Sequence, residues 1–322
     1  MMNLSNEGLI LHVGLPKTGT TTIQRALFAR HPQLYYLGKI VKNDKKNKDC
    51  LDYATYRVLE NVLWRLNRPF KAEHAKHLFQ DTLRPKIPEG RFLAASWEGL
   101  GHRATVKFLE MLRRVKTVFG GCRIIFVLRN PLTQIPSIYI QNLRGHFVQN
   151  EYSWLGHKTY VDIETWYRKR DKHISKASPL FNYCSCLRAA IDFLGKENVG
   201  IFLFEDLQTD SDSYYRAVCE FMQIDPEVGV SLAEKKHLHG RISQTQVDYL
   251  RKVNSSLISR SYVWFLSKDT RRKTFRSKAG GPPAKALLTD DLAREISEAT
   301  REGHRWLVDN FNLPLEKYDY PL

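Results

Sequence analysis

Residues 12–22 read HVGLPKTGTTT, and this stretch decides how the rest of the chain is interpreted. Gly14 and Gly19 have the separation of the two glycines in the phosphate-binding loop G-x-x-x-x-G-K-[ST]. Thr20, however, occupies the place of the usual lysine, and Lys17 lies inside the loop. The stretch therefore predicts either a defective loop or a working loop built for a different anion.

The chemistry of these residues favours a working loop. Glycines let the backbone close around an anion, and successive N–H groups at a helix N-terminus supply donors and positive potential. Four threonines add hydroxyl donors: Thr18, Thr20, Thr21 and Thr22. Lys17 is placed to reach the outer end of the bound group.

The flanking residues match the context that a phosphate loop needs. Residues 9–13 are apolar and read as a buried strand, and residues 20–30 read as a helix with apolar positions along one side. Further apolar runs of strand length alternate with helical stretches, at residues 34–37, 91–96, 123–128 and 198–204. This alternation predicts an α/β fold with a parallel sheet covered on both faces. Without a linker or repeat, we expect a single domain over residues 1–322, with helical additions at its C-terminal end.

A second anion-binding element is expected where the strongest strand ends. Arg129-Asn130-Pro131 follows residues 123–128, and Ser137 comes eight residues after Arg129. Ligands of open α/β sheets lie at the carboxyl ends of strands, and the planar arginine side chain can donate twice to a phosphate. Alone, this element is equally compatible with a structural ion pair.

Together the two elements resemble a known family. Pro16-Lys17-Thr18-Gly19-Thr20-Thr21 is similar to the 5′-phosphosulfate loop of sulfotransferases that use 3′-phosphoadenosine 5′-phosphosulfate (PAPS). Arg129-Asn130-Pro131 through Ser137 is similar to the 3′-phosphate motif of the same enzymes. A looser similarity extends to Phe204-Glu205-Asp206-Leu207 and to Asp309-Asn310-x-x-Leu313.

The resemblance implies a P-loop fold, a three-layer α/β sandwich whose central, mainly parallel sheet has about five strands. It implies transfer of a sulfuryl group from PAPS to a hydroxyl, or less often an amine, leaving adenosine 3′,5′-bisphosphate. By the same resemblance, Arg129 and Ser137 hold the 3′-phosphate. The residues of the first element then hold the 5′-phosphosulfate: Pro16, Lys17, Thr18, Gly19, Thr20 and Thr21.

The displaced lysine fits this chemistry. Negative charge builds on the bridging oxygen as the sulfuryl group leaves, and a cation placed there stabilises the transition state. A sulfuryl group carries less charge than a terminal phosphoryl group, and the strand at residues 123–128 ends in Arg129 rather than in an acidic metal ligand. We therefore expect transfer without a metal ion.

A general base is expected after the strand at residues 91–96. Glu98 resembles the Glu of an S-x-E-type segment in bacterial members of the family, with Trp97 inserted, and is the preferred base. His102 is the alternative base. The Glu and the bacterial resemblance favour a carbohydrate or glycoconjugate acceptor, and a phenolic or natural-product acceptor stays open.

The charge of the chain suggests an anionic partner. Fifty Lys and Arg stand against 34 Asp and Glu, for a net charge of +16. A nucleic-acid-binding protein is one rival, but the basic residues are spread over several segments rather than interleaved with aromatics on one face. A P-loop nucleoside or sugar kinase is the other, and the position of Lys17 argues against it. We expect no nucleic-acid partner.

Five remaining features complete the expectations. Five cysteines in no regular framework predict reduced thiols and a cytoplasmic protein, and no apolar run is long enough to span a membrane. His237-x-His239 lacks a third ligand at metal spacing. The basic stretch at residues 268–278 is expected to be a solvated loop, with binding of the donor or of an acidic substrate as the alternative. Cys184-x-Cys186 is expected to point to two faces of one helix.

Overall fold

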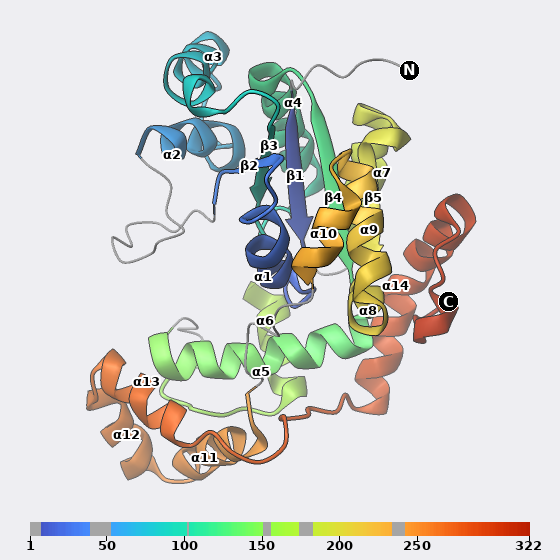
Figure 1. Cartoon of the computed structure of the whole chain (residues 1–322). Helices are drawn as coiled ribbons and strands as arrows, with labels where there is room; N and C mark the ends of the chain where they lie inside the picture. Colours follow the sequence, from blue (N-terminus) through green and yellow to red (C-terminus); the bar gives the residue numbers. More distant parts are fainter. Residues whose placement is uncertain (1–7, 39–52, 102, 151–155, 174–182, 234–241) are drawn as a thin grey trace. The chain divides into compact units, whose positions relative to one another are not determined.

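A computed structural model describes residues 8–38, 53–101, 103–150, 156–173, 183–233 and 242–322 (Figure 1). The chain forms two compact units, and each unit is built from two separate stretches. Unit 1 comprises residues 1–129 and 179–238, and unit 2 comprises residues 130–178 and 239–322. The chain therefore leaves unit 1 directly after Arg129 and returns to it at Pro179. A single domain over all 322 residues stays a prediction.

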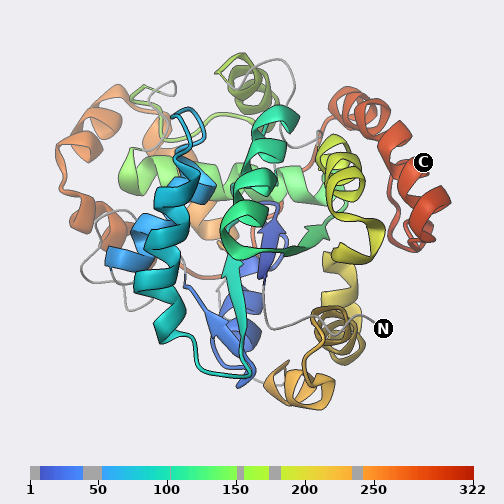
Figure 2. The ribbon, with the colours of Figure 1, turned by 90° about the horizontal axis from the view of Figure 1, so that it is seen from above.

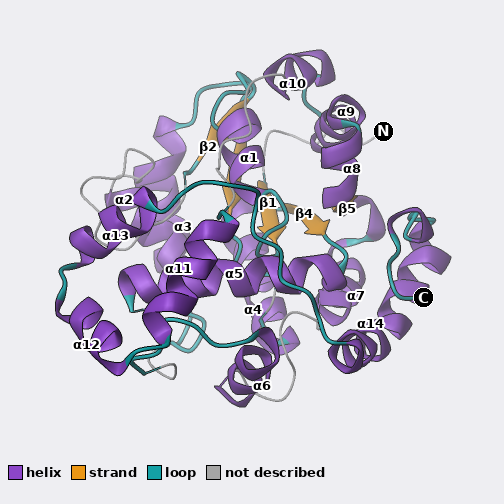
Figure 3. Ribbon diagram, turned by 90° about the horizontal axis from the view of Figure 1, so that it is seen from below, coloured by secondary structure: helices purple, strands orange, loops and turns teal. Residues whose placement is uncertain are grey.

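Unit 1 contains a five-stranded parallel sheet in the order β2-β3-β1-β4-β5. Its strands, in chain order, are β1 (Leu9–Gly14), β2 (Leu34–Tyr36), β3 (Phe92–Ser96), β4 (Cys122–Leu128) and β5 (Val199–Leu203). β1 lies in the middle and pairs with β3 on one side and with β4 on the other. All five carboxyl ends therefore lie at one edge, which Figure 3 views from below. The predicted α/β fold with a parallel, five-stranded sheet is confirmed.

Helices cover both faces of this sheet (Figures 1 and 2). On one face, Ile125 and Val127 of β4 pack in a cluster with the helical segments η1 (Ile23–Phe28), α9 (Ser211–Met222) and α10 (Pro226–Ala233). On the other face, Phe126 meets Phe108 of α4 (Thr105–Phe119) with ring centroids 5.9 Å apart. Neighbouring strand residues point to opposite faces, and helices cover both faces. Every side chain from Ile124 to Leu128 is therefore buried.

The remaining helical segments of unit 1 connect or flank these layers. They are α1 (Thr20–Thr22), α2 (Tyr53–Leu59), η2 (Glu60–Trp64), α3 (Ala72–Leu78), η3 (Phe79–Leu83), η4 (Arg84–Lys86), α7 (Tyr183–Leu194), η6 (Lys196–Asn198) and α8 (Phe204–Thr209). Helix α7 contacts α4, β4 and β5, so it covers the same face as α4. Cys186 of α7 is fully buried and Cys184 is half-buried, which confirms that the two thiols lie on different faces of one helix.

Unit 2 is helical among the residues described. Its helical segments are α5 (Pro131–Gln149), α6 (Ile163–His173), α11 (Gln244–Asn254), α12 (Leu257–Phe265), α13 (Lys268–Ser277), α14 (Asp290–Phe311) and η7 (Glu316–Tyr318). Helix α5 contacts α6, α13 and α14. Tyr139 and Phe147 of α5 are buried there, Tyr139 against Trp166 of α6 and Phe147 against Phe275 of α13.

The basic stretch differs from its expected form. Residues 268–277 form helix α13 rather than a solvated loop. Ser267 caps the helix by accepting a hydrogen bond from the Thr270 N–H, and Arg271 and Phe275 are buried. Two buried positions four residues apart give this charged segment one packed side, which its charge alone conceals.

The described residues contain no helix with the length and apolarity needed to cross a bilayer.

Candidate functional site

The loop that follows β1 requires its two glycines. Gly19 has φ 75°, in the left-handed region that glycine adopts without strain, and it stands directly before helix α1. A Cβ atom on Gly14 would lie 2.4 Å from Thr20 Oγ1, so only glycine lets the strand end approach the helix start this closely. The backbone is thereby closed into a cradle of the type that holds anions at helix N-termini.

Two threonines shape the loop from inside. The Thr18 hydroxyl donates to the Leu15 carbonyl at 2.7 Å, and Thr18 Oγ1 lies 3.4 Å from Thr20 Oγ1. Thr18 and Thr20 are buried, whereas Pro16, Lys17 and Thr21 are partly exposed. The Thr18 hydroxyl therefore stabilises the shape of the loop.

Arg129 and the loop are in direct contact. Arg129 Nη1 donates to the Lys17 carbonyl at 2.9 Å, and the guanidinium lies 4.6 Å from the centre of the Phe204 ring. Phe204, the first residue of α8, also lies beside Gly19, where a Cβ atom would come within 3.2 Å of its ring. The ends of β1, β4 and β5 are thus joined through one arginine. The sequence predicted Arg129 as a phosphate ligand, but it did not predict that Arg129 bonds to the main chain at Lys17.

The segment after β3 lies against the same loop. Gly101 is buried, and a Cβ atom there would lie 3.4 Å from the Val13 carbonyl oxygen. The Trp97 N–H donates to the His12 carbonyl at 3.0 Å, and the Trp97 and Trp64 rings meet edge to face at 5.1 Å. The structure therefore places the turn that carries Glu98 beside the loop that carries Lys17.

Glu98 itself is half-buried and, within the described parts of the chain, takes part in no ion pair or hydrogen bond. A carboxylate in this state keeps both oxygens available as acceptors. The alternative base, His102, lies outside the described residues.

A buried polar group of three residues lies behind the loop, and the sequence did not identify it. Ser96 Oγ accepts a hydrogen bond from Gln24 Nε2 at 2.9 Å and lies 2.8 Å from His12 Nδ1. The three residues are at most 4% exposed and come from β3, η1 and β1. Burial lowers the pKa of His12 to about 3, so the ring is neutral and Nδ1 can accept the Ser96 hydroxyl hydrogen. The group connects the start of the Glu98 turn to the end of β1, next to the loop that carries Lys17.

The sequence held one signal for this group. His12 interrupts an apolar strand, and a polar residue at a fully buried strand position requires a partner.

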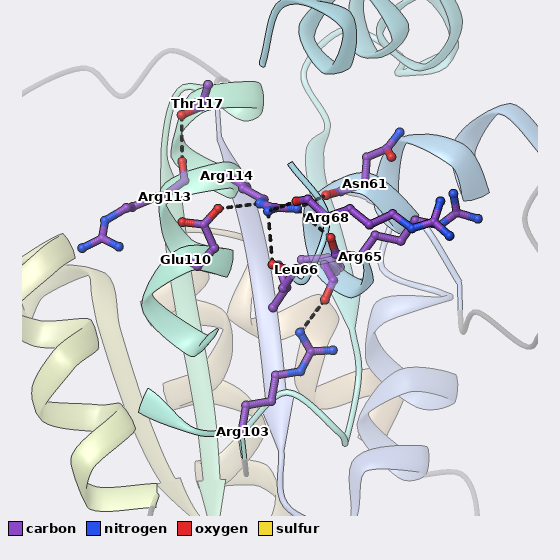
Figure 4. A network of polar contacts seen from close by, with 10 residues as sticks. Asn61, Arg65, Leu66, Arg68, Arg103, Glu110, Arg113, Arg114 and Thr117 are labelled. Carbon is purple, nitrogen blue, oxygen red and sulfur yellow. Dashed lines mark hydrogen bonds and ion pairs between the residues drawn. The ribbon is translucent and has the colours of Figure 1, made fainter. Parts of the chain in front are cut away.

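A second network fixes the residues around Trp64 (Figure 4). Arg114 of α4 uses every N–H of its guanidinium, donating to the Glu110 carboxylate and to main-chain carbonyls after and within η2. These carbonyls belong to Asn61, Arg65, Leu66 and Arg68, at 3.0 to 3.4 Å. Arg103 donates to the Leu63 carbonyl at 2.5 Å. Two arginines therefore hold the backbone on both sides of Trp64, the partner of Trp97.

Ser137 lies in unit 2, two turns into α5, and is half-buried. Asn130 caps the same helix, accepting a hydrogen bond from the Leu132 N–H at 2.9 Å, and Pro131 occupies its first position. The amide of Asn130 donates to the carbonyls of Tyr318 and Asp319. The assignment of Ser137 to a phosphate stays a prediction.

Three thiols of unit 1 are held in the neutral form by burial. Cys122, Cys186 and Cys219 are buried, and burial raises the pKa of each thiol to about 12. No cluster of three His, Cys, Asp or Glu side chains suited to a metal occurs in the described ranges. His237 and His239 lie outside these ranges.

A cavity of about 450 Å³ lies elsewhere in unit 1. Gly8, Leu93 and Gly120 line it, so it opens at the amino ends of β1 and β3. The loop that carries Lys17, Arg129 and the Glu98 turn lie at the carboxyl ends, where open α/β sheets bind their ligands.

Comparison with protein families gives one match. The model of the Sulfotransferase family matches residues 10–227, more than half of the chain, from β1 into α10. No curated protein matches.

Solved structures give further similarities, all at low identity. A sulfotransferase from Alicyclobacillus acidocaldarius is 14% identical over 82% of this chain and 98% of its own, with a TM-score of 0.44. The sulfotransferase domain of the curacin biosynthetic pathway is 13% identical over 91% and 97%, with a TM-score of 0.43. Mouse sulfotransferase SULT7A1, solved with PAP, is 14% identical over 98% and 88%, with a TM-score of 0.48.

Proposed function

Because this chain belongs to the sulfotransferase family, we propose that it transfers a sulfuryl group from PAPS to a hydroxyl of an acceptor. The observation that carries the proposal is the pairing of two elements at one sheet edge. The loop around Lys17 is closed by glycines, and Arg129, the first residue after β4, bonds to its backbone. Both elements resemble the two phosphate sites of the PAPS-dependent enzymes.

The residues present fit such a donor. The loop between Gly14 and Thr20 has no room for a Cβ atom on Gly14. It leads into a helix whose first N–H groups have no partner within the helix. The 5′-phosphosulfate would be held by the backbone from Pro16 to Thr21 together with the Lys17 ammonium. Arg129 would hold the 3′-phosphate, with Ser137 joining it by resemblance.

PAPS supplies an activated sulfuryl group on a phosphate leaving group. The Lys17 ammonium would offset the negative charge that develops on the oxygen between phosphorus and sulfur as the S–O bond breaks. Glu98 would take the proton from the acceptor hydroxyl while the hydroxyl oxygen bonds to sulfur. The products would be a sulfate ester and adenosine 3′,5′-bisphosphate. The ammonium supplies the positive charge that a metal provides in triphosphate chemistry, so we propose metal-independent transfer.

The surroundings of Glu98 support a hydroxylated acceptor, with a carbohydrate as the preferred class. Trp97 is half-buried beside Glu98, and its ring is fixed against Trp64. Aromatic faces of this kind stack on sugar rings or planar phenols. The free thiols of Cys122, Cys184, Cys186 and Cys219 support a cytoplasmic location.

The proposed function is tested by ligand stabilisation followed by turnover. Adenosine 3′,5′-bisphosphate should raise the melting temperature more than ATP with Mg²⁺ or single-stranded DNA does. Labelled PAPS should then give a labelled product with at least one member of a panel of carbohydrates and phenols, in the presence of EDTA. Stabilisation by ATP with Mg²⁺ alone would point to a kinase and refute the proposal.

A further inference from the structure

Helix α12 exposes a row of large apolar side chains. Ile258, Tyr262 and Phe265 are 83%, 65% and 89% exposed, and Leu257 beside them is 73% exposed. Positions 258, 262 and 265 are spaced by four and three residues, so they form one row along the helix. We call these four residues the α12 stripe. Contiguous exposed apolar surface of this kind marks an interaction site on most proteins.

The opposite side of α12 attaches the helix to unit 2. Val263 is 3% exposed, and Trp264 Nε1 donates to the His157 carbonyl at 2.8 Å. The Arg271 guanidinium lies 4.7 Å from the centre of a Trp264 ring. Ser256 caps the helix by accepting from the Ser259 N–H. The fold is therefore maintained without the α12 stripe, which leaves that stripe free for a partner.

Basic residues precede and follow the α12 stripe in the sequence. Residues 251–278 contain nine Lys or Arg and a single acidic residue, Asp269, which pairs with Arg272. This segment carries +8, half of the net charge of the whole chain. Arg251 pairs with Asp248, and the other exposed cations precede and follow α12 in the sequence: Lys252, Lys268, Lys273, Arg276 and Lys278. Helices α12 and α13 lie at the end of unit 2 opposite α14 (Figures 1 and 3).

We propose that the α12 stripe and its basic surroundings form a docking surface for an anionic phospholipid bilayer. Interfacial helices combine an apolar side that enters the headgroup region with cations that meet acidic lipids. Here the apolar side chains project from a short helix, and the cations flank them on both sides in sequence. The surface lies beyond residues 10–227, the part of the chain that the family model matches.

Charge decides between this occupant and others. A second copy of the chain would bring two surfaces of +8 together, and like charges facing each other oppose association. A nucleic acid would neutralise the cations but would leave Ile258 and Phe265 in water. An anionic bilayer satisfies both features at once, because its phosphates meet the cations and its acyl boundary takes the apolar tips.

The proposal does not depend on the reaction, so its test measures binding alone. The full chain is sedimented with vesicles of phosphatidylcholine, with and without phosphatidylserine. We expect the protein to pellet with the phosphatidylserine vesicles only and to be released by high salt. Each basic residue near the surface contributes about a fivefold increase in partitioning at low salt.

Two double variants separate the apolar and the charged contribution. Ile258→Ser with Phe265→Ser should weaken binding to the phosphatidylserine vesicles by about tenfold or more. Lys273→Gln with Arg276→Gln should weaken it by about 20-fold. The matched control is Val106→Ser with Lys107→Gln, which removes an exposed apolar and a basic residue from α4 in unit 1. Equal melting temperatures establish that all four proteins are folded.

Three results would overturn the proposal. The first is a wild-type protein that stays in the supernatant with phosphatidylserine vesicles, which would leave an acidic protein as the better occupant. The second is full binding by the Ile258/Phe265 variant, which would reduce the contact to non-specific charge attraction. The third is a wild-type dimer that Phe265→Ser converts to a monomer, which would identify a second copy as the occupant.

Discussion

Lys17 has a backbone conformation that is uncommon for a residue with a side chain. Its φ of 68° lies in the left-handed region, which costs a non-glycine residue on the order of 1 kcal/mol. The bond from Arg129 to the Lys17 carbonyl helps to hold this conformation. A glycine would fit the position better, so the lysine is kept there at a cost in stability. Such strain is typical of functional sites.

Two substitutions separate the charge of Lys17 from its strain. Lys17→Ala and Lys17→Gly should both lower turnover by roughly 10²- to 10³-fold, because each removes the ammonium that we propose stabilises the leaving oxygen. Lys17→Gly should also keep or raise the free energy of unfolding, by at most about 1 kcal/mol, because the strain disappears. Turnover with labelled PAPS and urea denaturation measure the two effects. Normal turnover by either variant, with Lys107→Gln as the active control, would exclude Lys17 from the reaction.

The polar group of His12, Gln24 and Ser96 leads to a stability prediction. Ser96→Ala removes the shared oxygen and leaves the Gln24 amide and His12 Nδ1 without a partner in a buried place. We expect the free energy of unfolding to fall by about 2–4 kcal/mol, since each unpaired buried group costs about 1–3 kcal/mol. Urea denaturation measures this change. Ser231→Ala, at an exposed serine, should stay within about 0.5 kcal/mol of wild type, and an equally small loss for Ser96→Ala would contradict the role of the group.

At the scale of the element, Arg114 connects α4 to the backbone after η2. Its neighbour Arg113 is exposed, and Figure 4 shows the Arg113 side chain pointing away from the network. Helix periodicity separates the two: positions 111, 112, 115 and 118 are buried with Arg114, while position 113 faces solvent. Arg114 therefore satisfies several main-chain carbonyls, whereas Arg113, the residue before it, lies on the protein surface.

Arg114→Met should destabilise the protein by about 3–5 kcal/mol. The substitution keeps much of the side-chain length but leaves four carbonyls and the Glu110 carboxylate without their donor. Arg113→Met is the matched control and should change the free energy of unfolding by about 0.5 kcal/mol or less. Thermal or urea unfolding compares the two, and similar values for both variants would show that the network contributes little.

Some elements are predicted by the hydrophobic pattern of the sequence, whereas others depend on packing against distant parts of the fold. Strands β1 and β4 are largely apolar runs next to glycine or arginine, and their bounds lie within about one residue of the expected ones. The strand expected over residues 198–204 ends at Leu203, and Phe204 begins helix α8, where Phe204 and Leu207 lie beside Gly19. The last third of the chain reads as helical from about Ser243, yet its basic stretch at residues 268–278 was expected to be a solvated loop, because charge is local information. The burial of Phe275 instead depends on the distant helix α5.

At the scale of the whole molecule, buried histidines make stability depend on pH. Burial lowers the pKa of His12 to about 3 and that of His304 to about 4, although the hydrogen bond of His304 to the Pro321 carbonyl opposes the shift. Both groups have a normal pKa near 6.5 when unfolded, so the unfolded chain binds more protons between pH 6.5 and 4. Their contribution to stability is complete above pH 6.5 and is lost as the pH falls through this range.

We therefore expect the free energy of unfolding to fall below pH 6.5 by about 1.4 kcal/mol per pH unit for each of the two histidines. Urea denaturation at a series of pH values measures the slope. His304→Gln should reduce this slope by about 1.4 kcal/mol per pH unit, the contribution of one proton. His74→Gln, at an exposed histidine, should leave the slope unchanged. A wild-type slope equal to that of His304→Gln would show that His304 titrates normally.

The interleaving of the two units was not predictable from the sequence. No change in composition and no linker marks the passage from Arg129 to Asn130, where the chain leaves unit 1. The motif that resembles a 3′-phosphate site continues across this passage, so a local pattern joins residues that the fold assigns to different units. Only the contacts that form after folding define the boundary.

This interleaving has a consequence for synthesis on the ribosome. Strand β4 pairs with β5, but about 70 residues separate Leu128 from Val199. Much of that stretch belongs to unit 2. At about 5–20 residues per second, β4, which can pair with β1 on one side, waits roughly 4–14 seconds for its second partner. During that interval a nascent chain presents an unpaired hydrophobic edge, which invites aggregation. Production of this protein should therefore benefit from chaperones that shield nascent chains and from slower growth at low temperature.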